Sequence, residues 1–175
     1  MCIRDRFVPG SESASAQIPV AESPSGVAVN PYSKRVYVAL SNGTVDVIDG
    51  RKNRIVKTVT VGGDNAGIAV NATTGYVFFT DNSFGIATVG ILGSSGTLLA
   101  NVALGNTPYG VDVDLVTNLA FVTNAQDHTV SVIDGKTNAV RGVLAVTGLS
   151  IAANPSTGKV YVGGQDNSIT VISEK

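Results

Sequence analysis

Short apolar runs recur along this chain at an interval of about 40 residues. The first run of each unit alternates small and branched apolar residues and ends in Asn or Asp. Its four copies lie at 26–30, 67–71, 110–114 and 150–154. A fixed interval of this length predicts a repeat architecture in which each unit is one supersecondary structure.

Further apolar runs complete the unit. The second run carries a central aromatic residue in each copy: Tyr37, Phe78, Phe121 and Tyr161. The third run lies at 44–49, 129–134 and 168–173, with a degenerate copy near 86–91. A fourth run closes the first three units at 55–61, 98–104 and 140–146. The runs are short and rich in β-branched or aromatic residues, and Gly, Asn, Asp or Pro bounds them, which predicts strands joined by turns.

Four strands in about 40 residues are typical of one propeller blade. We therefore predict an all-β fold: a β-propeller with about four four-stranded antiparallel blades. The blades should span residues 16–175, with repeats near 21–61, 62–104, 105–146 and 147–173. Asp49-Gly50 and Asp134-Gly135 predict tight hairpin turns between third and fourth strands. Asp114 stands where the other units have Asn, so we expect it to form an Asx turn.

The repeat resembles the YVTN (YncE-like) propeller repeat. The resemblance rests on the pattern Pro-x-Gly-Val-x-Val-(Asn/Asp), then Val-Tyr-Val, then Thr-Val-x-Val-Ile-Asp-Gly-x-x-Asn, and it covers residues 18–173. Residues 121–124, Phe-Val-Thr-Asn, are the nearest copy of the naming tetrapeptide. The resemblance implies a seven-bladed ring in a periplasmic, secreted or surface-layer protein whose role is binding.

The two ends of the chain bear on how the ring is completed. Residues 16–20 align with the fourth strand of a preceding or closing blade, and the last unit has no fourth run. A closed four-bladed ring is one reading; a fragment of a larger, seven-bladed ring is the one we expect. Residues 1–6 resemble the translation of a sequencing adapter, which we interpret as an artefact, and 7–15 as an unstructured lead-in. A signal peptide would then have been lost by truncation.

Catalytic chemistry has little support in the composition. The 175 residues carry a net charge of −1, one histidine (His128) and one cysteine (Cys2). A Ser-His-Asp or Cys-His centre would have to use this histidine, no Gly-x-Ser-x-Gly nucleophile elbow occurs, and zinc requires several His or Cys ligands. We therefore predict no catalytic residue, no metal site and no cofactor. No apolar run is long enough for a transmembrane helix.

Charged residues sort between the two faces of the predicted disc. In an antiparallel blade, the first and third turns share one face, and the second turn and the link to the next blade share the other. The first face collects the basic candidates: Lys34, Arg35, Arg51, Lys52, Arg54, Lys136 and Lys159. The second is acidic and rich in amides, and its candidate ligand-binding residues are Asn82, Tyr109, Asn124, Gln126, Asp127, His128, Gln165 and Asp166.

These observations favour a non-enzymatic propeller of the cell envelope or secreted space that binds a ligand or a protein, or acts as a scaffold. The amide-rich face predicts a small polar ligand or a peptide as partner, because Asn and Gln offer paired donors and acceptors. The basic face predicts an anionic polymer or the envelope surface. The alternative is part of a propeller enzyme, lactonase-like or quinoprotein-like, whose catalytic residues lie in further blades.

Overall fold

The computed structural model describes residues 16–83, 86–164 and 166–173, and every regular element in them is a β-strand. The strands form four separate antiparallel sheets, which we call blades 1 to 4. Blade 1 contains β1 (Pro24–Asn30), β2 (Arg35–Leu40), β3 (Thr44–Asp49) and β4 (Arg54–Thr60). Blade 2 contains β5 (Asn65–Val70), β6 (Val77–Ser83), β7 (Ile86–Leu92) and β8 (Leu98–Ala103).

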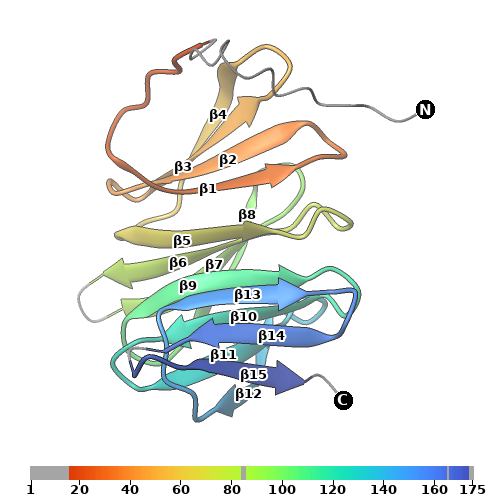
Figure 1. Ribbon diagram of the computed structural model, residues 1–175. Coiled ribbons are helices and arrows are strands. Elements are labelled where there is room, and N and C mark those ends of the chain that lie inside the picture. Colours follow the sequence, from red (N-terminus) through yellow and green to blue (C-terminus); the bar gives the residue numbers. More distant parts are fainter. Residues whose placement is uncertain (1–15, 84–85, 165, 174–175) are drawn as a thin grey trace, which may run out of the picture.

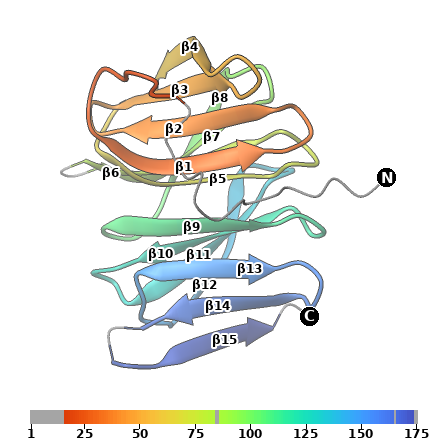
Figure 2. The ribbon, with the colours of Figure 1, turned by 45° about the horizontal axis from the view of Figure 1, so that its top comes forward.

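The third and fourth sheets repeat this order. Blade 3 contains β9 (Pro108–Asp114), β10 (Leu119–Asn124), β11 (Thr129–Asp134) and β12 (Ala139–Leu144). Blade 4 contains β13 (Ser150–Asn154), β14 (Lys159–Gly163) and β15 (Ile169–Ser173). Within every sheet each strand pairs with the next one along the chain. This meander, repeated blade by blade in Figures 1 and 2, confirms the predicted all-β propeller fold.

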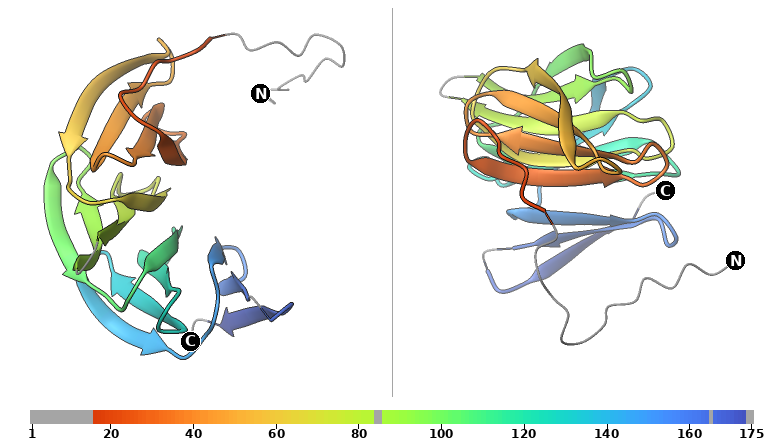
Figure 3. Two further views of the ribbon diagram at one scale, coloured as in Figure 1. Left: turned by 90° about the vertical axis from the view of Figure 1, so that its left-hand side faces the viewer. Right: turned by 90° about the horizontal axis from the view of Figure 1, so that it is seen from above.

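The blades stand side by side in an open arc. Contacts between blades are most numerous among first strands, β1 with β5, β5 with β9 and β9 with β13. First strands are therefore innermost, where the blades converge, and β4, β8 and β12 lie on the outer rim (Figure 3). Blades 1 and 4 end the arc without meeting each other (Figure 3), so the described residues do not form a closed four-bladed ring.

The hydrophobic core lies between the blades. Tyr37 of blade 1 packs in one cluster with Val77 and Phe79 of blade 2. Phe78 and Phe121 occupy the same repeat position as Tyr37, and each packs toward the following blade. Because a sheet has two faces and each must be covered, every inner blade depends on both neighbours for its burial.

The turns between the first two strands of the blades follow the Asx pattern. Asp114 Oδ1 accepts hydrogen bonds from the backbone N–H groups of Val116 (2.6 Å) and Thr117 (3.0 Å), which confirms its predicted role. Asn30 makes the equivalent pair of bonds in blade 1. The side chain stabilises the turn by satisfying backbone donors that have no strand partner.

The turns between third and fourth strands are longer than the Asp-Gly pairs predict. The β3–β4 turn has four residues, 50–53, and Asn53, not Gly50, has the left-handed backbone, with φ 49°. Gly50 instead leaves room for a close backbone neighbour. A Cβ atom there would lie 3.0 Å from the carbonyl oxygen of Lys34, to which the Gly50 N–H donates a 2.9 Å hydrogen bond.

Residues 16–20 form no strand, but they are packed onto blade 1. Ile18 and Val20 contact a small cluster that contains Val38, Leu40 and Ile48. Residues 1–15, which include the adapter-like segment and the predicted lead-in, lie outside the described residues.

Candidate functional site: the two loop faces of the blades

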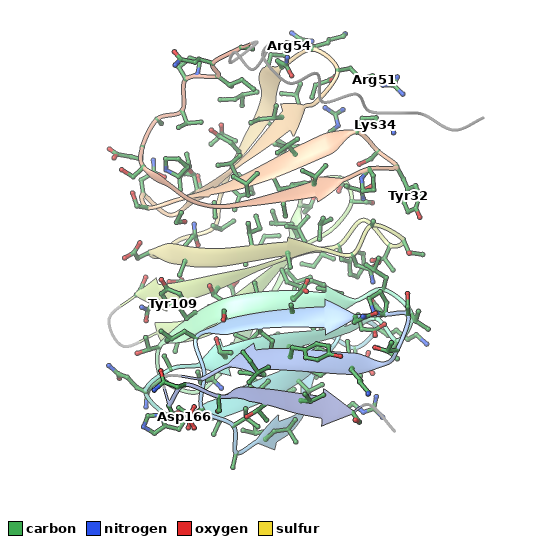
Figure 4. The ribbon with its side chains drawn as sticks, viewed as in Figure 1. Tyr32, Lys34, Arg51, Arg54, Tyr109 and Asp166 are labelled. Atoms are coloured by element: carbon green, nitrogen blue, oxygen red, sulfur yellow. The ribbon has the colours of Figure 1, made fainter. Side chains whose placement is uncertain are left out.

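The antiparallel order of the strands places the turns on two opposite faces. The β1–β2, β3–β4, β9–β10, β11–β12 and β13–β14 turns emerge on one face, which we call the basic face. The β2–β3 and β10–β11 turns and the links between blades emerge on the other, which we call the amide face. Figure 4 shows Tyr32, Lys34 and Arg51 at the first edge, and Tyr109 and Asp166 at the opposite one.

The basic candidates are distributed unevenly along the arc. Five of the seven belong to the two adjacent turns of blade 1 and the strand ends beside them: Lys34, Arg35, Arg51, Lys52 and Arg54. Lys136 lies in the β11–β12 turn of blade 3, and Lys159 begins β14 of blade 4. The turns of blade 2 on this face, 71–76 and 93–97, carry no cation. The positive charge is therefore concentrated on blade 1.

One of these five cations is paired. Arg35 Nη1 lies 3.8 Å from Asp49 Oδ2, and this is the one salt bridge in the part of the chain that the structure describes. Asp49 also accepts hydrogen bonds from the N–H groups of Arg51 and Lys52. The hydrogen bond from the Arg51 N–H is the main cause that holds the pKa of Asp49 below its ordinary value, and the neighbouring cations add to it.

The remaining four cations are exposed, and an exposed aromatic ring lies in one of the same two turns. Tyr32, which precedes Lys34 in the β1–β2 turn, has 76% of its surface accessible. We call this set the blade-1 basic patch: Tyr32, Lys34, Arg51, Lys52 and Arg54 (Figure 4 labels all but Lys52). Four ammonium and guanidinium groups on two adjacent turns form a surface that attracts anions.

On the amide face, several candidate side chains already have partners within the protein. Asn124 is 1% exposed, and its amide donates to Thr129 Oγ1 (3.0 Å) and Ser131 Oγ (2.9 Å), so it supports its own turn. Asp127 accepts hydrogen bonds of 2.8 Å from both the backbone N–H and the side-chain amide of Asn106.

The pKa values of the two exposed candidate carboxyls follow from these partners. The two hydrogen bonds from Asn106 lower the pKa of Asp127, and the bond from the backbone N–H contributes most. The Ser168 hydroxyl lowers the pKa of Asp166 in the same way, across a 2.6 Å hydrogen bond. Both carboxylates are therefore ionised at neutral pH. Asp166 is engaged within its own turn, whereas Asp127 joins the β10–β11 turn to the link between blades 2 and 3.

The other candidates on this face are more accessible. Tyr109 is 51% exposed near the start of the inner strand β9, while Gln126 and His128 are exposed in the β10–β11 turn. Asn82 is half-buried at the end of β6, where its N–H donates to Asp64 O (3.0 Å). Gln165 lies outside the described residues.

The described ranges hold no group of three or more His, Cys, Asp or Glu side chains placed to bind a metal ion. His128 is exposed in a turn and has a left-handed backbone, with φ 53°. The described residues contain no helix, and therefore no helix that could cross a membrane.

A cleft of about 620 Å³ between blades 3 and 4 was not foreseen from the sequence. It is lined mainly by apolar groups of β10, β11, β12 and β15, including Phe121, Leu144 and Ile172. Ile172 and Ser173, at the end of β15, line it together with the β9–β10 and β13–β14 turns.

Comparison with known proteins supports the fold. No protein-family model matches the chain, and no curated protein is significantly similar to it. The chain is similar in structure to hydrazine synthase of Kuenenia stuttgartiensis, at 12% identity and a TM-score of 0.77, over 96% of this chain and 49% of that one. It is also similar to the WD40 β-propeller domain of Doa1, at 16% identity and a TM-score of 0.72, over 87% and 51%. The chain thus spans about half the length of each, and at these identities the similarity concerns the fold alone.

Proposed function

We propose that this chain is a non-enzymatic binding module, built from YVTN-type propeller repeats, that attaches to an anionic polymer through the blade-1 basic patch. The observation that carries the proposal is the concentration of Lys34, Arg51, Lys52 and Arg54 on adjacent turns of one blade. The chain as a whole has a net charge of −1, so the patch is a local feature and not a consequence of overall charge.

The chemistry of the patch suits a polymer better than a small ligand. The four cations are exposed on turns, and the cleft between blades 3 and 4 lies toward the other end of the arc. Exposed cations attract a chain of anions by summed long-range attraction, whereas a small ligand requires a concave pocket. An anionic polymer of the cell envelope, in the periplasm or at the surface, is the partner that fits the repeat type and this patch.

The amide face is the weaker candidate for binding. Asn124 is buried, Asp127 is held by hydrogen bonds from Asn106 in the link between blades 2 and 3, and Asp166 is held by a hydrogen bond from its own turn. Tyr109, Gln126 and His128 remain accessible there.

The proposal is tested by titrating the chain with a heparin fragment at two salt concentrations. The triple variant Lys34→Gln, Arg51→Gln, Arg54→Gln should bind the fragment about tenfold more weakly or worse at low salt, because three of the four free cations of the patch are lost. The difference between variant and parent should shrink at high salt, where screening removes the attraction from both.

A matched control separates the patch from net charge. The triple variant Lys136→Gln, Arg141→Gln, Lys159→Gln removes the same three charges from exposed positions on blades 3 and 4, and it should bind within about twofold of the parent. Equal weakening by both triple variants would show that bulk charge decides binding, and affinity independent of salt would exclude the ionic mechanism.

A further inference from the structure

Two residues of the β1–β2 turn differ in kind from their counterparts in the other blades. At the position of Lys34 the other three blades have glycine or asparagine: Gly75, Asn118 and Gly158. At the position of Tyr32 they have smaller residues without a ring: Thr73, Val116 and Ser156. The repeat therefore forms this turn without a cation and without an aromatic side chain, and blade 1 adds both.

Lys34 is not the residue that its backbone favours. Its φ is 58°, in the left-handed region, and its three counterparts have the same conformation, with φ of 77°, 59° and 61°. Glycine adopts this conformation without steric cost and asparagine adopts it more readily than most residues, whereas a long side chain is disfavoured there. An unfavourable residue held at such a position is typical of a functional site.

The β3–β4 turn of blade 1 is enriched in cations in the same way. Arg51, Lys52 and Arg54 lie in it or at its end, whereas the corresponding turn of blade 2, residues 93–97, consists of glycine, serine and threonine. The turn of blade 3 has the same length as that of blade 1 and also ends in a left-handed asparagine, but it has one cation, Lys136. The cations of blade 1 are therefore additions to the turn and not requirements of its geometry.

The turn positions of the patch are exposed in the inner blades as well. Val116, at the position of Tyr32, is 77% exposed although blade 3 has a blade on each side. Thr73 is exposed at the same position of blade 2, and Lys136 is exposed in the third turn of blade 3. The accessibility of the blade-1 basic patch is thus a property of these turns and does not depend on what stands beside blade 1.

The turn that carries the exposed ring is anchored to the protein. Asn30 is 2% exposed, and its Oδ1 accepts hydrogen bonds from the N–H groups of Tyr32 (3.0 Å) and Ser33 (3.1 Å). The Nδ2 group of Asn30 donates a 3.3 Å bond to the carbonyl oxygen of Ala72 in blade 2. Because the backbone is held in this way, a ligand that packs on the ring has little loop entropy to overcome.

The charges of the patch are separated along the edge of blade 1. Figure 4 shows four of its residues in a row from the inner to the outer strands: Tyr32, Lys34, Arg51 and Arg54. The Arg35–Asp49 ion pair (3.8 Å) lies at the strand ends between the two turns, where its charges offset each other. The two turns are two strand spacings apart, which is about 10 Å. The order is therefore ring, cation, neutral interval and cation cluster.

This order favours a polymer whose anions are separated. A polymer with an anion on every unit, such as polyphosphate, would also place negative charge against the Asp49 carboxylate, and the juxtaposition of like charges opposes binding. A polysaccharide with a neutral sugar between its anions presents an uncharged unit at that point. An exposed tyrosine ring offers a flat apolar surface with a polar tip, which suits the C–H face of a neutral sugar.

Resting on the proposed function, we propose that the anionic polymer bound by the blade-1 basic patch is an acidic polysaccharide whose anions alternate with neutral sugars. One neutral sugar packs on the ring of Tyr32, and the anion next to it pairs with Lys34. The following neutral sugar passes the Arg35–Asp49 pair, and the next anion reaches the cations of the β3–β4 turn.

Fluorescence anisotropy with labelled oligomers at low salt tests the polymer class. The probes are a hyaluronan oligosaccharide, in which glucuronate alternates with a neutral N-acetylhexosamine, and linear polyphosphate with the same number of charges. The parent chain should bind the oligosaccharide more tightly. Tyr32→Ala should weaken oligosaccharide binding about tenfold and polyphosphate binding by less than about twofold, because only the sugar packs on the ring. Val116→Ala, at the same repeat position with 77% exposure, is the matched control and should leave both affinities unchanged.

Lys34→Gly separates binding from folding. The variant should bind both probes more weakly, because a cation is lost, and its urea midpoint should equal or exceed that of the parent, because glycine adopts a φ of 58° more readily than lysine. A lower midpoint would show that the lysine stabilises its own turn, and it would overturn the proposal.

The outcomes distinguish failure of the polymer class from failure of the proposed function. If neither probe binds, or if the triple variant of Lys34, Arg51 and Arg54 binds both as the parent does, the proposed function fails and the polysaccharide with it. If both probes bind through these cations but polyphosphate binds as tightly, or Tyr32→Ala weakens both equally, the polysaccharide alone is refuted. Tighter binding of an oligothymidylate of equal charge, lost in Tyr32→Ala, would assign the patch to nucleic acid and would likewise refute it.

Discussion

Single hydroxyl groups join neighbouring blades at the residue scale. Thr80 is fully buried in β6, where its Oγ1 accepts a 2.7 Å hydrogen bond from the Gly67 N–H and donates a 3.0 Å bond to the carbonyl oxygen of Tyr109 in the next blade. Thr123 makes the same two contacts one blade later, to Gly110 and to Leu149 O. The threonine of the repeat is therefore a connector between blades.

The glycine of the repeat belongs to the same connection. A Cβ atom at Gly67 would overlap the carbonyl oxygen of Tyr109, so only glycine lets the next blade approach closely enough to receive the hydroxyl bond. Blade 1 has Ala39 at the threonine position, and there Asn65 donates instead to Leu40 O and Thr44 O. Two different side chains thus stabilise equivalent blade interfaces.

Thr80→Val should lower the free energy of unfolding by about 1–3 kcal/mol, because the shape is kept while the buried Gly67 N–H loses its acceptor. Urea denaturation followed by circular dichroism measures this loss. Thr73→Val, at an exposed turn position, is the matched control and should change stability by less than about 0.5 kcal/mol. Equal urea midpoints for Thr80→Val and Thr73→Val would show that the Thr80 hydroxyl contributes no stability across the blade interface.

At the scale of elements, the third strand of blade 2 shows why one copy of the repeat looks degenerate. Gly90 in β7 stands where blade 1 has Asp46 and blade 3 has Ser131. It pairs with Phe79, and a Cβ atom at Gly90 would overlap the phenyl ring. The bulky Phe79 replaces a valine of the other blades, and glycine on the partner strand makes room for it.

Gly90→Ala should therefore destabilise the protein by about 1–3 kcal/mol through overpacking. Gly142→Ala makes the same change in the interior of another strand, β12, where the added Cβ would meet no atom within 4 Å. That control should be neutral or slightly stabilising, since alanine restricts the unfolded chain. Thermal unfolding of both variants gives the comparison, and a Gly90→Ala protein as stable as its parent would contradict the packing argument.

At the scale of the whole molecule, the same repeat position contributes differently to stability in different blades. Phe78 is 0% exposed between blades 2 and 3, whereas Tyr161 is 37% exposed at the end of the arc. In dilute solution Phe78→Ala should cost about 3–5 kcal/mol of stability. Tyr161→Ala should cost no more than about 1 kcal/mol there, because little burial is lost.

Urea unfolding of both variants measures these two losses. A loss for Tyr161→Ala as large as that for Phe78→Ala would contradict the argument that burial between blades sets the contribution of this repeat position.

The basic residues of the candidate site and their concentration on one blade were predictable from the sequence, whereas the burial of an amide-face candidate was not. The basic residues lie on the face that strand order predicts, because alternate turns of an antiparallel meander must emerge on the same side. Their concentration on blade 1 follows from the repeat alignment, in which residues 34–54 hold five of the seven. The burial of Asn124 was not predictable, since it depends on Thr129 and Ser131 across the turn.

The sequence by itself determined the strands, their order within each blade and the division of turns between two faces. These are local properties, set by side-chain alternation and by residues such as Asp114 that form turns with their nearest neighbours. Only the tertiary structure decided which copies of a repeated position are buried, where the cleft lies and that the arc stays open. Those features depend on what stands beside each blade, and identical residues such as Tyr37 and Tyr161 differ in burial because one has a neighbouring sheet and the other has water.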